Sequence, residues 1–161
     1  MKAGGTVLRI AFVTVPRFLL GTLMLTAIAI NFANVLGRYL AGSPLFWAEE
    51  ILVFITIWGV FVGMAACAYE GRHLNMDLLS AAIEGRPKIV LNASIALAIV
   101  ACCVFMVVQS FQVVTLFINS DQVSVAAGVP KAIPHAALAV GFALTALAVM
   151  VRIRSYISGR F

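Results

Sequence analysis

The sequence predicts an all-α membrane protein with four transmembrane helices, and three observations support this fold class. Hydrophobic residues make up 63% of the 161 residues and charged residues only 11%, a composition far from that of a soluble globular domain. The charges are confined to short intervals between four apolar runs, and each run has the roughly 20 residues that a helix needs to cross a bilayer. The runs are continuously apolar and do not alternate at period two, which disfavours a β-barrel. We expect residues 1–161 to form a single membrane domain, a bundle of four spans.

The four predicted spans cover about residues 18–37, 48–69, 89–118 and 132–151. The first span follows a basic segment, as the apolar part of a secretory signal peptide does. No good small-x-small cleavage site follows the run, which ends in Asn34-Val35-Leu36-Gly37-Arg38, so we expect a retained first span. Pro130 and Pro134 stand where the start of a helix tolerates proline, which agrees with a fourth span that begins near them.

The connection between the second and third spans carries a helical pattern of its own. If residues 74–84 form a helix, Asp77, Ser80 and Glu84 share one narrow face and the other side is apolar. This pattern predicts a short amphipathic helix that lies in the membrane surface and ends at Gly85. In the alternative, the segment extends a neighbouring span.

The basic residues predict the orientation of the chain in the membrane. Nine of the 11 Lys and Arg residues lie before the first predicted span, between the second and third, or after the fourth, and only Arg38 and Lys131 lie in the other two connections. Because basic residues collect on the cytoplasmic side, we expect both termini in the cytoplasm. The net charge of +5 therefore needs no nucleic-acid partner, and no soluble face interleaves basic residues with aromatic ones.

Two adjacent carboxylates, Glu49 and Glu50, open the second span just after Trp47 and Ala48, and Trp47 fits an interfacial aromatic anchor. A charge held within lipid is costly unless it is paired, so we expect Arg38 at the end of the first span to pair with one glutamate. Neighbouring residues on a helix point about 100° apart, so the other carboxylate would face water, a headgroup or a partner chain. A structural role is favoured over a proton relay, because relays usually lie deeper in a bundle.

Small residues and amides indicate where the spans pack. Gly59 and Gly63 form a small-xxx-small pair, a spacing that lets two helix backbones approach closely but that also arises by chance in Gly- and Ala-rich membrane proteins. Gln109 and Gln112 form an i, i+3 pair in the third span and are expected to hydrogen-bond to neighbouring helices. No acidic residue lies deep in any predicted span, which argues against an autonomous proton- or cation-coupled carrier.

Four motifs between residues 38 and 79 point to one family. They are Arg38, then Trp47-Ala48-Glu49-Glu50, then Trp58-Gly59-Val60-Phe61-Val62-Gly63, then Glu70-Gly71-Arg72-His73-Leu74-Asn75-Met76-Asp77-Leu78. Together they resemble the small membrane subunit of TRAP transporters, the DctQ-like family of tripartite ATP-independent periplasmic carriers. Outside this quarter of the chain, the likeness lies only in the length, the four spans and the inside termini.

The resemblance implies a complex of the bacterial inner membrane that imports a small organic acid, typically a carboxylate, with a sodium gradient. In that family a large multi-span permease subunit holds the ion and substrate sites, and a periplasmic binding protein captures the ligand. The small subunit would be a fixed scaffold that clasps the large subunit within the lipid bilayer. It would hold no cofactor of its own, since the sodium ions would bind in the large subunit.

The resemblance also suggests roles for polar residues at both ends of the second span. Arg38, Glu49 and Glu50 would stabilise the turn between the first two spans and contact the large subunit or the binding protein. At the inner end, a cluster of polar side chains, here called the polar knot, would fix the surface helix to the second span. A structural role of this cluster is preferred to a functional site. The knot would consist of Glu70, Arg72, His73 and Asp77.

Two other classes of function remain open. A stand-alone small transporter that works as a homodimer would need a charged substrate site within the bundle, and none is evident. A membrane-anchor subunit of a redox complex would need two haem-ligating histidines, but His73 and His135 are predicted on opposite sides of about 30 Å of hydrocarbon. A thiol oxidoreductase would need accessible cysteine pairs in the outer loops, whereas Cys102 and Cys103 are predicted inside the third span.

Overall fold

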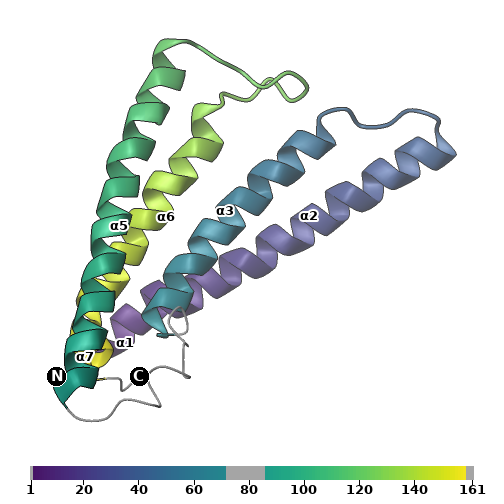
Figure 1. Cartoon of the computed structure of the whole chain (residues 1–161). Coiled ribbons are helices and arrows are strands. Elements are labelled where there is room, and N and C mark those ends of the chain that lie inside the picture. The colour runs from purple at the N-terminus through teal and green to yellow at the C-terminus, as the bar shows by residue number, and fades with distance from the viewer. Residues whose placement is uncertain (1, 72–85, 159–161) are drawn as a thin grey trace.

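The computed structural model describes residues 2–71 and 86–158 of the chain (Figure 1). These residues form helices joined by short connections, and the bridge between Val123 and Pro130 is the one strand-like pairing among them. The helices are α1 (Lys2–Arg9), the π-helix η1 (Ile10–Thr14), α2 (Val15–Leu40), α3 (Ala48–Tyr69), α5 (Arg86–Asn119), α6 (Ala132–Val151) and α7 (Ile153–Ser158). The predicted all-α class is confirmed.

Within residues 2–71 and 86–158, four helical stretches are long and apolar enough to cross a membrane, as the sequence predicts. They are Thr6–Leu40, Ala48–Tyr69, Pro87–Asn119 and Ala132–Val151. The first and third are longer than their apolar runs suggest, because a helix continues past the point where its composition becomes polar. At 1.5 Å per residue, the 33 residues of the third stretch extend about 50 Å, which exceeds the roughly 30 Å of a hydrocarbon core.

The first stretch passes through a π-helical turn without a break. In η1 the N–H of Val15 donates to the carbonyl of Ile10, five residues earlier. Pro16 follows directly and has no N–H to donate to the preceding turn. The wider π-helical turn accommodates this proline near the start of α2, so that α1, η1 and α2 act as one span.

The four spans lie in one open layer, which is looser than the expected bundle. The helix α2 packs on α3, α3 on α6, and α6 on α5, while α7 also packs on α5. Figure 1 shows that the helices converge at the end that holds α1 and α7, here called the inner end. They diverge toward the connections 41–47 and 120–131, here called the outer end. A membrane helix gains little by leaving lipid for an equally apolar neighbour, so nothing in the apolar pattern forces the layer to close.

A cluster of buried hydrophobic residues lies at the inner end, around Tyr69. The ring of Phe12 stacks on that of Tyr69 with 5.2 Å between the centroids, and the Arg152 guanidinium carbon lies 5.1 Å from the Tyr69 centroid. The Tyr156 hydroxyl donates to the carbonyl of Ala68 over 2.5 Å, which joins α7 to the end of α3. Burial raises the pKa of Tyr156 above its usual value, although Arg152 opposes this, so the hydroxyl keeps the proton that it donates.

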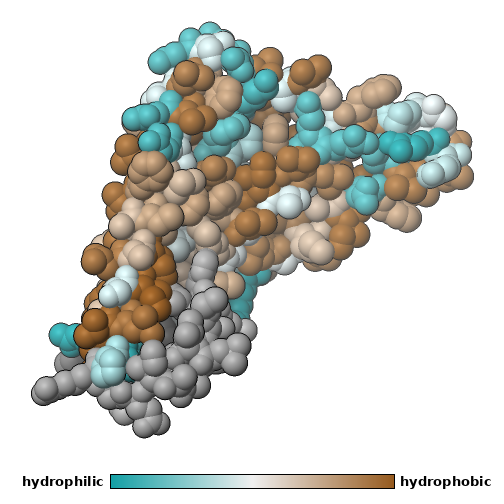
Figure 2. Space-filling view, viewed as in Figure 1, coloured by the Kyte–Doolittle hydropathy of each residue, from teal (hydrophilic) through white to brown (hydrophobic). Residues whose placement is uncertain are grey.

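Apolar side chains cover much of the surface beyond this cluster, as Figure 2 shows for one face. Large exposed examples on α2 and α5 are Phe18, Leu25, Phe32, Leu97, Phe105 and Phe111. Such a surface suits lipid or partner helices, not water. The helices α1 and α7 lie at the same end of the molecule, as an even number of spans requires (Figure 1). The predicted surface helix at 74–84 falls outside the described residues.

Candidate functional site

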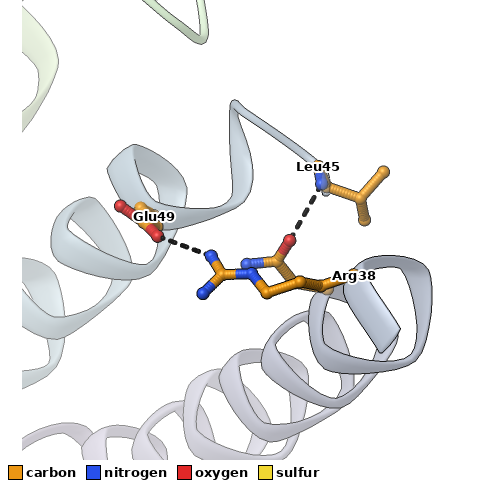
Figure 3. Close-up of polar contacts among 4 residues, drawn as sticks. Arg38, Leu45 and Glu49 are labelled. Atoms are coloured by element: carbon orange, nitrogen blue, oxygen red, sulfur yellow. Dashed lines mark hydrogen bonds and ion pairs between the residues drawn. The ribbon is translucent and has the colours of Figure 1, made fainter. Parts of the chain in front are cut away.

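The connection 41–47 joins α2 to α3 at the outer end, next to an ion pair between the two helices (Figure 3). Nη2 of Arg38 donates to Oε1 of Glu49 over 3.3 Å. The two side chains are 53% and 73% exposed, so water weakens their attraction, and pairs of this kind contribute about 1 kcal/mol or less. Arg38 therefore pairs with one of the two glutamates, through a weak surface contact.

A second side chain of α2, Asn34, holds the same connection from inside. Its Oδ1 accepts the N–H of Leu45 over 2.8 Å, and the residue is only 6% exposed. The carbonyl of Gly37 accepts the N–H groups of Ala41 and Ser43 and completes the turn. The spacing of Asn31, Asn34 and Arg38 predicts one polar stripe in the outer half of the first span, but the partner of Asn34 is a backbone group and could not be predicted.

The second glutamate binds the other outer connection of the same chain. Oε2 of Glu50 accepts hydrogen bonds from the Ser124 hydroxyl over 2.5 Å, from the Ala127 N–H over 2.8 Å and from the Ala126 N–H over 3.1 Å. The expectation for this carboxylate named water, a headgroup or a partner chain, and it did not include this connection of the same chain. The side chain of Glu50 leaves the helix about 100° from that of Glu49 and meets the 120–131 connection instead.

The 120–131 connection is itself an ordered turn. The N–H of Ser124 donates to the carbonyl of Val129 over 2.8 Å, and the N–H of Lys131 donates to the carbonyl of Gln122 over 3.0 Å. Gly128 has a φ of +65°, a conformation that favours glycine. This turn directs the N–H groups of residues 126 and 127 toward α3.

An open groove of about 520 Å³ lies between the outer ends of α3 and α6. Its apolar lining comes from Val53, Phe54, Ile57, Val125 and Pro134. Its polar lining comes from the first turns of the two helices and the connection between α5 and α6, and consists of Glu49, Glu50, Ser124, Lys131 and His135. The groove therefore joins an apolar floor to a charged rim.

The predicted glycine contact lies on the α2 side of α3, but a glycine of α6 has a closer neighbour. A Cβ atom on Gly59 or Gly63 would stand 3.7 Å or 3.6 Å from Leu20, an ordinary van der Waals distance. A Cβ atom on Gly141 of α6 would stand only 2.5 Å from the Cβ atom of Phe61. Gly141 has no glycine four residues away, so a search for paired glycines does not find it, although Ala137 and Thr145 lie at the small-xxx-small spacing on either side.

Two other predicted positions lie at the two ends of α3. Trp47 directly precedes the helix and is 42% exposed. At the inner end, Oε1 of Glu70 accepts a hydrogen bond from Nη2 of Arg17 over 2.6 Å, and the Glu70 side chain is 24% exposed. Sequence reasoning missed Arg17, which lies 53 positions earlier and shows no spacing relation to Glu70. The other residues of the predicted knot, Arg72, His73 and Asp77, lie outside the described residues.

One side of α5 carries exposed amides. Neither Gln109 nor Gln112 forms a side-chain hydrogen bond within the part of the chain that the structure describes, and both are exposed. With their exposed neighbours at helical spacing they form a continuous strip, which we call the amide face. The amide face consists of Cys102, Phe105, Gln109, Gln112 and Leu116.

The pairing of α5 with α6 places the amide face at mid-depth. Near the outer end, the rings of Phe117 and His135 lie 4.6 Å apart. Near the inner end, Asn92 Nδ2 donates to the carbonyl of Ile157 over 3.4 Å. Gln109 lies eight residues from Phe117, about 12 Å along the helix, while the 20 residues of α6 extend about 30 Å. Gln109 is therefore level with the middle of α6.

Acidic residues of the described part all lie at helix ends. They are Glu49, Glu50, Glu70 and Asp121. Within the same residues, no group of three or more His, Cys, Asp and Glu side chains could hold a metal ion. The polar groups found here bind connections and neighbouring helices.

Known proteins resemble this chain over most of its length. The sequence matches the family model of the tripartite ATP-independent periplasmic transporters, DctQ component, over residues 27–159. It is 33% identical over 90 residues to the C4-dicarboxylate TRAP transporter small permease protein DctQ of Vibrio cholerae, a match that covers 56% of this chain and 37% of that protein. It is 27% identical over 117 residues to the ectoine TRAP transporter small permease protein TeaB of Halomonas elongata. This match covers 71% of this chain and 60% of that protein. The matches thus span less than two thirds of either relative.

The family match extends well beyond the motifs that suggest it in the sequence. It includes Arg38 and the paired glutamates, the amide face of α5 and all of α6. The family consists of transporter components and not of enzymes. The chain therefore belongs to the DctQ family, the small permease components of TRAP transporters.

Proposed function

We propose that this chain is the scaffold subunit of a sodium-coupled TRAP transporter in a bacterial inner membrane, with both termini in the cytoplasm. It would clasp a large multi-span permease subunit that works with a periplasmic binding protein. The names of the relatives mention a C4-dicarboxylate and ectoine, and ectoine also carries a carboxylate. The cargo of the complex would be a small organic acid of this kind.

The observation that carries the proposal is the exposed amide face of α5. Two amides at mid-depth have no partner among the described residues, and lipid cannot supply one. Hydrogen bonds between helices satisfy such side chains and contribute about 1 kcal/mol each. A span of the large permease, packed along the amide face, would provide the missing partners.

The open layer of helices supports the same role. The α2 and α5 helices lie at its two edges, and large apolar side chains of both are exposed. A scaffold needs a broad surface in the membrane more than it needs an enclosed site. Binding of sodium and substrate is accordingly assigned to the permease and not to this chain.

Co-purification tests the proposal directly. The tagged full chain would be extracted from its native membranes in mild detergent and its partners identified by mass spectrometry. We expect a stoichiometric permease of many spans with the wild-type chain. Elution alone or as a homodimer would contradict the scaffold role and favour a stand-alone carrier.

The amide face makes the test specific. The double variant Gln109→Leu, Gln112→Leu should weaken association with the permease roughly 5- to 30-fold, since about 1–2 kcal/mol of hydrogen bonding is lost. Gln122→Leu, an exposed amide in the outer connection, serves as the matched control and should leave association unchanged. If the wild type, the double variant and the control recover equal amounts of the permease, the contact with the permease lies elsewhere.

A further inference from the structure

We propose that the groove between α3 and α6 binds a phospholipid whose headgroup carries both a phosphate and a primary amine. The groove is distinct from the amide face, so this site is independent of the contact proposed for the permease. Three features support the assignment: the depth of the groove, the charge at α6 and the charge at α3.

The depth of the groove suits an acyl chain. Its apolar lining continues along α3 from the first turn to Ile57, seven residues after Glu50 and about 10 Å further into the span. Val53 and Phe54 line the stretch between them, and Pro134 faces it from α6. Water forms no hydrogen bonds with such apolar walls. A hydrocarbon chain can fill the groove without losing any hydrogen bond.

Lys131 provides the site for the phosphate. It directly precedes α6, where the helix dipole favours an anion and not a cation. Among the described residues its ammonium group has no carboxylate within salt-bridge distance. His135 lies one turn further on, and its Nδ1 donates to the Lys131 carbonyl over 2.8 Å, so Nε2 is the ring atom left for another partner. A phosphate at this helix start would pair with Lys131 and with the positive end of the dipole.

Glu49 provides the site for the amine. Its side chain is 73% exposed and uses Oε1 for Arg38, which leaves Oε2 without a partner among the described residues. Glu49, Glu50 and Lys131 all line the groove, and because Oε2 of Glu50 already accepts hydrogen bonds from Ser124, Ala126 and Ala127, Glu49 is the carboxylate left to meet a cation beside Lys131. A headgroup with a phosphate and an amine complements both charges, whereas phosphatidylglycerol complements only Lys131. A free phosphate or a small carboxylate would leave the apolar lining uncovered.

Photo-crosslinking tests the assignment. The full chain, with whatever co-purifies with it, would be reconstituted in vesicles of phosphatidylethanolamine and phosphatidylglycerol. A trace of either lipid would carry a diazirine in its acyl chain, and labelled positions would be mapped by peptide mass spectrometry. We expect the phosphatidylethanolamine probe to label Val53, Phe54 and Ile57 more than the phosphatidylglycerol probe does, and added inorganic phosphate to leave this labelling unchanged.

Two variants and their controls separate the site from general contact with lipid. Lys131→Gln should lower the labelling roughly fivefold, which corresponds to the attraction between one lysine and an anionic headgroup. Ile57→Trp should fill the groove and lower it further. The controls are Lys88→Gln at the inner end and Val60→Trp on an exposed side of α3 outside the groove. In both control variants, the lipid probe should label the groove as strongly as it does in the wild type.

Three outcomes would overturn the assignment. Labelling of the groove that does not exceed labelling of the exposed side of α2 would show ordinary contact with lipid. If Lys131→Gln does not reduce labelling by phosphatidylethanolamine, the proposed contact between Lys131 and the headgroup is refuted. The result for Lys131→Gln tests the proposal even if Ile57→Trp fails to fold. Crosslinks from the groove to a protein partner, in place of lipid, would assign the groove to that partner.

Discussion

At the scale of single residues, two neighbouring glutamates bind two different connections. Glu49 reaches back to Arg38 at the end of α2, while Glu50 reaches across to the connection between α5 and α6. The sequence predicts the first contact, because an arginine lies at the end of the preceding span. The second could not be predicted, since two of the three donors are backbone N–H groups whose position depends on the fold of a turn 74 or more residues away.

Removal of the Glu50 carboxylate should loosen the 120–131 connection. In Glu50→Ala the N–H groups of Ala126 and Ala127 lose their acceptor, so both amides should exchange hydrogen with solvent several-fold faster. Hydrogen-exchange mass spectrometry of the purified chain in detergent measures this. Glu49→Ala, which breaks only an exposed pair, is the matched control and should leave the exchange of these two amides as in the wild type. The same exchange rate in both variants would contradict the contact.

Asn34 should matter more for stability than Arg38 does. Asn34→Ala leaves the N–H of Leu45 without its acceptor in a partly buried position and should cost about 1–2 kcal/mol of unfolding free energy. Arg38→Ala removes an exposed pair and should cost less than about 1 kcal/mol. Thermal unfolding in detergent, together with the rate of proteolysis at 41–47, ranks the two variants. The reverse ranking would mean that the ion pair holds the turn.

At the scale of elements, the spans are readable from the sequence but their contacts are not. A run of about 20 apolar residues is enough to identify each span. The glycine spacing in α3 points to Gly59 and Gly63, yet Gly141 of α6 has a tighter neighbour, Phe61 of α3, than either of them has. A contact between helices depends on both partners, and a pattern within one helix describes only one of them.

Gly141→Ala should destabilise the α3–α6 contact. The added methyl group would lie 2.5 Å from the Cβ atom of Phe61, which is fixed to the backbone and cannot turn away. Overpacking of this kind costs about 1–3 kcal/mol. Gly63→Ala is the control, because its methyl group would meet the flexible end of Leu20 at 3.6 Å. Thermal unfolding midpoints in detergent should fall for the first variant and stay the same or rise for the second, and equal midpoints would contradict the close approach.

At the scale of the whole molecule, the number of spans follows from composition, whereas their open arrangement does not. Lipid and apolar side chains are nearly equivalent neighbours, so the hydrophobic pattern leaves open whether α2 closes against α5 or stays at the edge of the layer. Contacts that define the layer, such as Arg17 with Glu70, join residues far apart in the sequence and carry no spacing signal. The charge pattern, by contrast, predicts an orientation for the whole molecule that experiment can test.

Cysteine labelling in intact cells measures that orientation. In a variant without the native cysteines, Ser43→Cys and Ser120→Cys place a thiol at exposed positions of the two outer connections, and Ser158→Cys places one at the end of α7. Because the helices alternate in direction and α1 and α7 share the inner end, the first two thiols must lie on one side of the membrane and the third on the other (Figure 1). Basic residues flank the inner end, so Ser43→Cys and Ser120→Cys should react with a membrane-impermeant maleimide in intact cells, and Ser158→Cys only after permeabilisation. The reverse pattern would refute the orientation and leave the fold intact, whereas reaction of all three in intact cells would contradict the four-span topology itself.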